Sequence, residues 1–134
     1  MATPTGLRIV EIHNASRGAT DPDQEWVRLV NEGAQRWDIR LWKLTDETDQ
    51  QLRPHVYEFP DKLSSGGDWW FDPAEEIYVY TGVGEDHFHA AASGAPAQFH
   101  LYWDRRAMVW NNQGDRVYLR NADGTFVTVP YPIP

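Results

Sequence analysis

Short segments in which apolar and polar residues alternate constrain this chain more than any other feature of its sequence. In residues 25–31, Val27 and Leu29 fall on one face and Arg28 falls on the other. A period of two is typical of a half-buried β-strand. Residues 116–121 repeat the pattern after a turn rich in Asn and Gly. No stretch shows sustained helical periodicity, so the sequence predicts an all-β domain.

Eight segments of this kind are separated by turn signals. In the first, the apolar positions change phase between Ile9 and Val10, which predicts a β-bulge or a switch between sheets. The last two are predicted to form a hairpin through residues 121–124, and Pro130 and the later prolines prevent further pairing. The predicted strands are residues 7–13, 25–31, 39–45, 55–59, 76–81, 97–103, 116–121 and 125–129.

The composition predicts a single domain that is held together by packing alone. With 134 residues, the chain is long enough to bury a core without covalent staples. It has no cysteine, so neither a disulfide framework nor a thiolate zinc site is available, but it has seven Trp, six Tyr and five Phe. We expect a β-sandwich over residues 7–129, a disordered lead over 1–6 and a Pro-rich tail over 130–134.

Charge and hydropathy exclude several classes of partner. The formal net charge of −8 argues against general binding to nucleic acid, which needs Lys and Arg to neutralise phosphates. The longest apolar run is far shorter than the roughly 20 residues that span a bilayer. Residues 1–6 lack the charged and apolar regions of a signal peptide. The chain as it stands is therefore expected in the cytoplasm, or outside it if an upstream leader is removed.

Several motifs follow one another in a definite order between residues 7 and 129. They are Ile9-Val10-Glu11-Ile12, Trp26 to Asn31, Asp38 to Leu44, Tyr57-Glu58-Phe59-Pro60, Leu63 with a glycine turn, Trp110-Asn111 to Leu119, and Asp123-Gly124. Their order and spacing resemble the lamin-tail domain family, of the bacterial type. The resemblance implies an immunoglobulin-like antiparallel β-sandwich in which no catalytic centre is known. In that fold Trp42 and Trp110 are predicted to be core residues.

The chain departs from the family pattern in two places. The family often has a small residue, commonly Gly, just before the tryptophan of its third strand, whereas this chain has Leu41. The resemblance therefore implies the fold but not the local turn geometry before Trp42. The family also passes from its leucine-glycine turn straight into the next strand, whereas this chain inserts residues 67–74.

The inserted segment contains three consecutive large aromatics, Trp69, Trp70 and Phe71, flanked by Asp68 and Asp72. Exposed aromatics with a polar rim often mark binding surfaces. The competing interpretation is that the loop folds back and caps the sandwich. Consecutive side chains of an extended segment cannot all face one side, so at least one is expected to be exposed. A second candidate surface is the face of Trp26, which is opposite Val27 and Leu29.

The sequence has no clear cofactor or metal site. His87 and His89 would share one side of an extended segment, with Glu85 and Asp86 beside them, and two imidazoles with a carboxylate can bind zinc. A complete site needs a further ligand, and the other histidines are His13, His55 and His100. We therefore expect a solvated loop there and no metal or cofactor. The acidic segments 21–25 and 46–49 lack the glycine turn and terminal Glu of a calcium loop.

Two classes of function remain. The resemblance implies a non-enzymatic adaptor module that binds a protein or a neighbouring domain, because family members resemble adaptors of exported or membrane-associated enzymes and docking surfaces in the nuclear lamina. The alternative is a carbohydrate-binding sandwich, in which Trp69, Trp70 and either Trp37 or Trp103 stack on sugar rings. A small hydrolase is disfavoured, because no nucleophile elbow, HExxH motif or phosphate-binding loop is present. The sequence does not indicate the oligomeric state.

Overall fold

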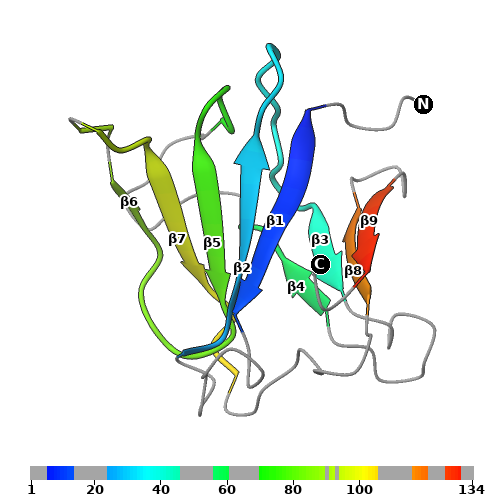
Figure 1. The fold of residues 1–134 in the computed structure, drawn as a ribbon. Coiled ribbons are helices and arrows are strands. Elements are labelled where there is room, and N and C mark those ends of the chain that lie inside the picture. The colour runs from blue at the N-terminus through cyan, green and yellow to red at the C-terminus, as the bar shows by residue number, and fades with distance from the viewer. Residues whose placement is uncertain are drawn as a thin grey trace.

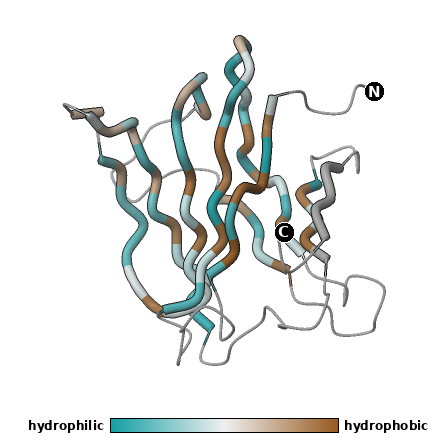
Figure 2. The backbone as a smooth tube through the Cα atoms, in the orientation of Figure 1, coloured by the Kyte–Doolittle hydropathy of each residue, from teal (hydrophilic) through white to brown (hydrophobic). Residues whose placement is uncertain are grey.

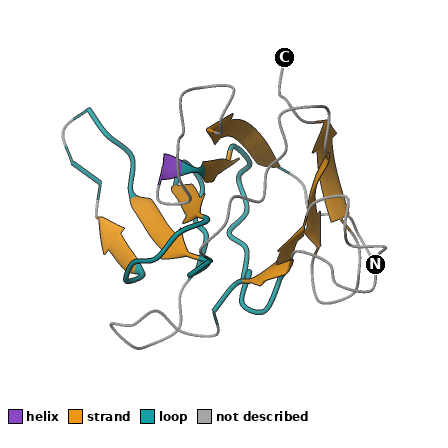
Figure 3. Cartoon of the chain, turned by 90° about the horizontal axis from the view of Figure 1, so that it is seen from below, coloured by secondary structure: helices purple, strands orange, loops and turns teal. Residues whose placement is uncertain are grey.

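The structure is a computed structural model, and it describes residues 6–13, 24–45, 56–60, 70–89, 91–92, 94–105, 116–120 and 126–130. Strands and loops make up nearly all of this part, and the one helical position in it is Gln24, just before the second strand (Figure 3). No helix within these ranges is long and apolar enough to cross a membrane.

The described residues form nine strands in two sheets that pack face to face (Figure 1). The five-stranded sheet has the order β1-β2-β5-β7-β6, and the four-stranded sheet has the order β4-β3-β8-β9. The predicted all-β, immunoglobulin-like sandwich is confirmed. The strands are β1 (Leu7–His13), β2 (Trp26–Asn31), β3 (Lys43–Thr45), β4 (Val56–Glu58), β5 (Glu76–Tyr80), β6 (His87–His89), β7 (Gln98–Tyr102), β8 (Arg116–Arg120) and β9 (Phe126–Pro130).

The strand pairing confirms two predictions of local structure. In the β1–β2 ladder Ile9 pairs with Leu29 and Glu11 with Arg28, so the register shifts across Val10 and the predicted bulge is present. Near the C-terminus β8 and β9 pair antiparallel, as the predicted hairpin requires. The prediction that Pro130 prevents pairing is wrong, because Pro130 pairs with Arg116 as the last residue of the edge strand β9, where a proline is tolerated. The hairpin turn itself lies outside the described residues.

The core lies between the two sheets and follows the period-two pattern. Along β5 the side chains of Ile77 and Val79 are buried, while Tyr78 and Tyr80 are partly exposed. Figure 2 shows the backbone coloured by hydropathy, with hydrophobic and hydrophilic stretches alternating along the strands of the larger sheet. Every strand of the five-stranded sheet except the edge strand β6 buries side chains in this way, and the second sheet contributes its own buried positions. The buried apolar side chains are Leu7, Ile9, Ile12, Val27, Leu29, Ile39, Trp42, Leu44, Tyr57, Phe59, Phe71, Ile77, Val79, Phe99, Leu101, Val117 and Leu119.

The predicted antiparallel pairing is wrong for one described pair of strands in the five-stranded sheet, which is parallel. β5 and β7 run in the same direction, with Ile77 beside Phe99, because β6 lies on the far side of β7 and pairs antiparallel with it. The prediction of a solvated loop at residues 85–89 is therefore wrong for 87–89, which form the edge strand β6. All three residues of β6 are exposed, so the strand has no buried alternating pattern that the sequence could reveal.

The segment before Trp42 is a turn, and the predicted strand 39–45 is therefore too long. Only Lys43–Thr45 is extended, and the amide of Trp42 donates a hydrogen bond to the carbonyl oxygen of Ile39 (3.2 Å). Leu41, the third residue of this turn, has φ = 65°. A type II turn places its third residue at positive φ and favours glycine there, which is the residue that the family often has at this place.

We expect Leu41→Gly to stabilise the domain by about 1 kcal/mol, because a side chain in the left-handed region costs roughly that amount. Leu41 is 50% exposed, so its removal sacrifices little packing. Urea denaturation of the two proteins measures the difference. A loss of stability in the glycine variant would show that the Leu41 side chain contributes contacts worth more than the backbone strain.

Candidate functional site: an aromatic face on the five-stranded sheet

The outer face of the five-stranded sheet carries a contiguous group of rings. We call Trp26, Tyr78, Tyr80, His100 and Tyr102 the aromatic face. These residues occupy outward positions of β2, β5 and β7, and each is partly exposed. The strand register aligns them, since Trp26 pairs with Tyr80, Tyr80 with Tyr102 and Tyr78 with His100. Alternation along the strands and register between them thus place five rings on one surface.

The rings stack on one another across the strands. The ring centroids of Tyr78 and His100 are 5.1 Å apart with an interplanar angle of 5°, and those of Tyr80 and Tyr102 are 4.8 Å apart at 15°. His87 on β6 extends the first stack, 4.8 Å from His100 at 1°. These spacings match the separation of neighbouring strands, so the stacks follow the direction in which strands are hydrogen-bonded. Each stacked contact covers one face of each of the two rings that it joins.

A chain of hydrogen bonds fixes the His100 ring. The side-chain amide of Gln98 donates to a carboxylate oxygen of Glu76 (3.1 Å), which turns the Gln98 carbonyl oxygen toward His100 Nε2 (3.0 Å). Nε2 therefore carries the ring proton, and Nδ1 accepts from the hydroxyl of Tyr80 (2.9 Å). Burial, followed by the neighbouring His87 and His89, lowers the pKa of His100 to about 4. The ring is thus neutral near pH 7.

The hydroxyl of Tyr80 is a neutral donor at physiological pH. Burial, followed by Tyr102 and Tyr78, raises its pKa to about 12. The charged groups on the same side of the sheet pair with one another: Arg28 contacts Glu11 at 3.4 Å and Glu76 at 3.0 Å. The aromatic face is therefore a largely uncharged surface on a protein whose net charge is −8.

Trp26 lies where the sequence placed it, on the face opposite the buried Val27 and Leu29, and it is partly exposed. The ring of His13 stacks on it at 5.2 Å and 12°, and Tyr78 meets it edge-on at 5.2 Å. Trp26 is thus the end of the aromatic face that is nearest β1.

We call the inserted segment 67–74 the aromatic loop, and its two described aromatic side chains, Trp70 and Phe71, differ in burial. Phe71 is completely buried, and its predicted place on a binding surface is wrong. The physical reason is a backbone bridge: Phe71 and Trp37 exchange hydrogen bonds of 2.9 and 3.1 Å, and Asn31 Nδ2 donates to the Phe71 carbonyl (3.0 Å). These bonds draw the loop against the sandwich, where Phe71 joins the core.

Trp70 points the other way and is 40% exposed, as expected for consecutive aromatics. The guanidinium of Arg36 lies 4.5 Å from its ring centroid, and Arg36 Nε donates to Asp72 (2.9 Å). Arg36 therefore covers part of the exposed ring. Trp69 lies outside the described residues, so it stays a prediction.

Three other tryptophans named in the sequence analysis are described by the structure, and all three pack in or against the core. Trp37 and Trp103 are only partly buried, but both pack against the core, and Trp103 Nε1 donates to the carbonyl oxygen of Val56 (3.1 Å). Trp42 is buried, as predicted, with its ring 6.1 Å from that of Trp37. Trp110 lies outside the described residues.

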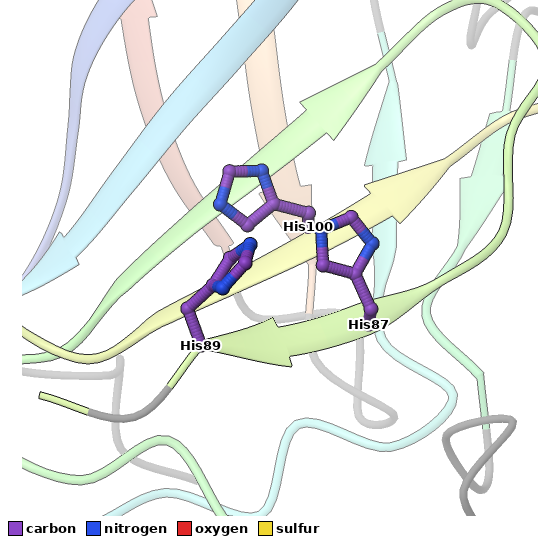
Figure 4. A group of neighbouring side chains, drawn as sticks. All are labelled: His87, His89 and His100. Carbon is purple, nitrogen blue, oxygen red and sulfur yellow. The ribbon is translucent and has the colours of Figure 1, made fainter.

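Three histidines meet at the β6 edge of the aromatic face, and one of them, His100, belongs to that face (Figure 4). His87 and His89 project from the same side of β6, and His100 projects beside them from β7. One ring nitrogen from each lies within 4.8 Å of the others. Asp86, a carboxylate near this segment, instead accepts a hydrogen bond from the amide of Tyr102 (2.9 Å). The sequence places His87 and His89 close together, and the fold adds His100, which is at least 11 residues away along the chain.

A hollow of about 340 Å³ lies at the C-terminal end of β2, beside the segment that leads into β5. Its polar side chains are Asn31, Glu32 and Glu76, and its lining includes no histidine, serine, lysine or cysteine. Both carboxylates already have partners: Glu32 pairs with Arg8 (3.0 Å), and Glu76 pairs with Arg28 (3.0 Å) and accepts a hydrogen bond from Gln98 (3.1 Å). We assign no reaction to it.

The sequence pattern predicts a surface position for Trp26, but it does not single out Tyr78, Tyr80, His100 and Tyr102. A signal was present, because these residues occupy the outward positions of two strands that were predicted correctly. The order of the strands in the sheet, in which β7 lies between β5 and β6, could not be inferred from the sequence. Without that order, nothing in the sequence shows that the outward positions of these strands share one surface.

The family model of the Lamin Tail Domain matches residues 1–131. A comparison with curated proteins finds no match to the chain.

Proposed function

Since this chain belongs to the Lamin Tail Domain family, we propose that it is a non-enzymatic docking module that binds a protein, either a separate partner or a neighbouring domain, on its aromatic face. One observation carries the proposal: five partly exposed rings form a contiguous, largely uncharged surface on the outer face of one sheet. Tyrosine and tryptophan dominate protein interfaces because they bury much area at low cost in conformational entropy.

The geometry favours a protein over a carbohydrate as the occupant. Sugar binding by stacking needs an open ring face, but the faces of Tyr78 and His100 cover each other, as do those of Tyr80 and Tyr102. One face of Trp26 is covered by His13. These contacts reduce the flat ring area on which a sugar could stack, whereas a surface that combines apolar rings with hydroxyl and imidazole groups suits the mixed apolar and hydrogen-bonding contacts of a protein interface.

Site-specific photo-cross-linking tests this function. A benzophenone amino acid replaces Tyr102 on the aromatic face, and in a matched control it replaces Tyr118, an outward residue of β8 on the other sheet. In the native cells we expect a discrete protein adduct from position 102 and none from position 118. The same adduct from both positions would contradict the proposed face.

Calorimetric titration of the purified domain with a panel of soluble oligosaccharides distinguishes protein docking from the alternative function, carbohydrate binding. We expect no saturable heat from any sugar. Saturable binding that disappears in Trp70→Ala would instead support the carbohydrate function and move the site to the aromatic loop.

A further inference from the structure

The three histidines beside the aromatic face lie on adjacent strands and point the same way. The register pairs His87 directly with His100, and His89 lies two residues further along β6, so the side chains share one face of the β6–β7 ladder. The rings of His87 and His89 are 4.8 Å apart, and those of His89 and His100 are 5.0 Å apart. This cluster shares His100 with the aromatic face, but the inference drawn from it does not depend on the proposed docking function.

We propose that His87, His89 and His100 form a binding site for a divalent transition-metal ion of the zinc type. Imidazole nitrogen is a preferred ligand of Zn²⁺, Cu²⁺ and Ni²⁺, whereas Mg²⁺ and Ca²⁺ select oxygen. Three protein ligands with water in the fourth position are a common zinc arrangement. No other described group of three or more histidines, cysteines or carboxylates lies close enough to compete.

The described hydrogen bonds prepare two of the three rings for this role. His87 Nδ1 lies 2.9 Å from the backbone carbonyl oxygen of Glu85, which can only accept, so Nδ1 carries the proton and Nε2 keeps a lone pair. Metal-bound histidines usually have such an outer partner, which fixes tautomer and orientation. His100 has partners at both nitrogens, Tyr80 and Gln98. A metal ion would bind one ring nitrogen of His100 in place of Tyr80 or Gln98, and the other of these two residues would stay hydrogen-bonded to the second nitrogen.

Closing the site needs only side-chain rotation. Nitrogens bound tetrahedrally to zinc at about 2.0–2.1 Å lie about 3.3 Å apart, compared with separations of up to 4.8 Å here. His87 and His89 are exposed, so their rings have room to turn inward. The ion would then join β6, an edge strand of three residues, to β7 at the sheet edge.

The test is calorimetric titration of tag-free protein with ZnCl₂, and with MgCl₂ in parallel. We expect one saturable zinc site, no response to magnesium, and a thermal midpoint that rises with zinc because the ion binds the folded state. His87→Ala and His89→Ala should each weaken binding by at least about tenfold. Both side chains are exposed, so these variants are expected to fold.

His13→Ala is the matched control, because His13 lies on the same sheet face but on β1, away from the cluster. It should bind zinc as tightly as the original protein. Amide hydrogen exchange should slow in residues 87–89 when zinc is added, and this slowing should vanish in His87→Ala. Absence of a saturable site, or equal loss of affinity in His13→Ala and His89→Ala, would overturn the proposal.

Discussion

Phe71→Ala is expected to destabilise the domain by about 3–5 kcal/mol, because it removes a completely buried ring and leaves a cavity. Trp70→Ala, one residue away, should cost less than about 1 kcal/mol, since Trp70 is 40% exposed and its described ring contact is with the side chain of Arg36. The pair is its own control, because both variants truncate an aromatic in the same loop. Urea denaturation measures both free energies of unfolding. Equal losses would mean that the loop does not divide its side chains between core and solvent.

The second large effect is expected for Trp42→Ala, again about 3–5 kcal/mol. Trp42 is 6% exposed and packs in the core beside Trp37, and its carbonyl oxygen accepts a hydrogen bond from the amide of Phe59 (2.8 Å). Truncation would therefore open a cavity where the turn after Ile39 meets the sandwich. Thermal and urea unfolding should agree on the loss. A change below about 1 kcal/mol would show that the indole is not a core element.

The architecture could be predicted from the sequence because alternation reports burial directly. β5 is the clearest case: Ile77 and Val79 are inside, and Tyr78 and Tyr80 are outside. The bulge at Val10 was also visible, because an extra residue inverts the alternating pattern. Such features depend only on neighbours along the chain.

What could not be predicted depends on contacts between distant segments. β6 has no buried side chain, so no pattern distinguishes His87–His89 from a loop. Its third histidine partner comes from β7 and is brought close by the sheet order alone. Phe71 was assigned to the surface with its two neighbours, because the backbone bridge to Trp37 that turns it inward joins residues 34 positions apart.

The central claim is that the aromatic face is the docking surface, and the affinity for the cross-linked partner tests it most directly. Calorimetry would compare the original domain with Trp26→Ala/Tyr102→Ala and with the control Tyr118→Ala, after circular dichroism has shown that all three are folded. We predict that the double variant loses at least about 100-fold in affinity, which corresponds to roughly 3 kcal/mol, and that the control stays within about threefold. A double variant that binds as tightly as the control would contradict the account.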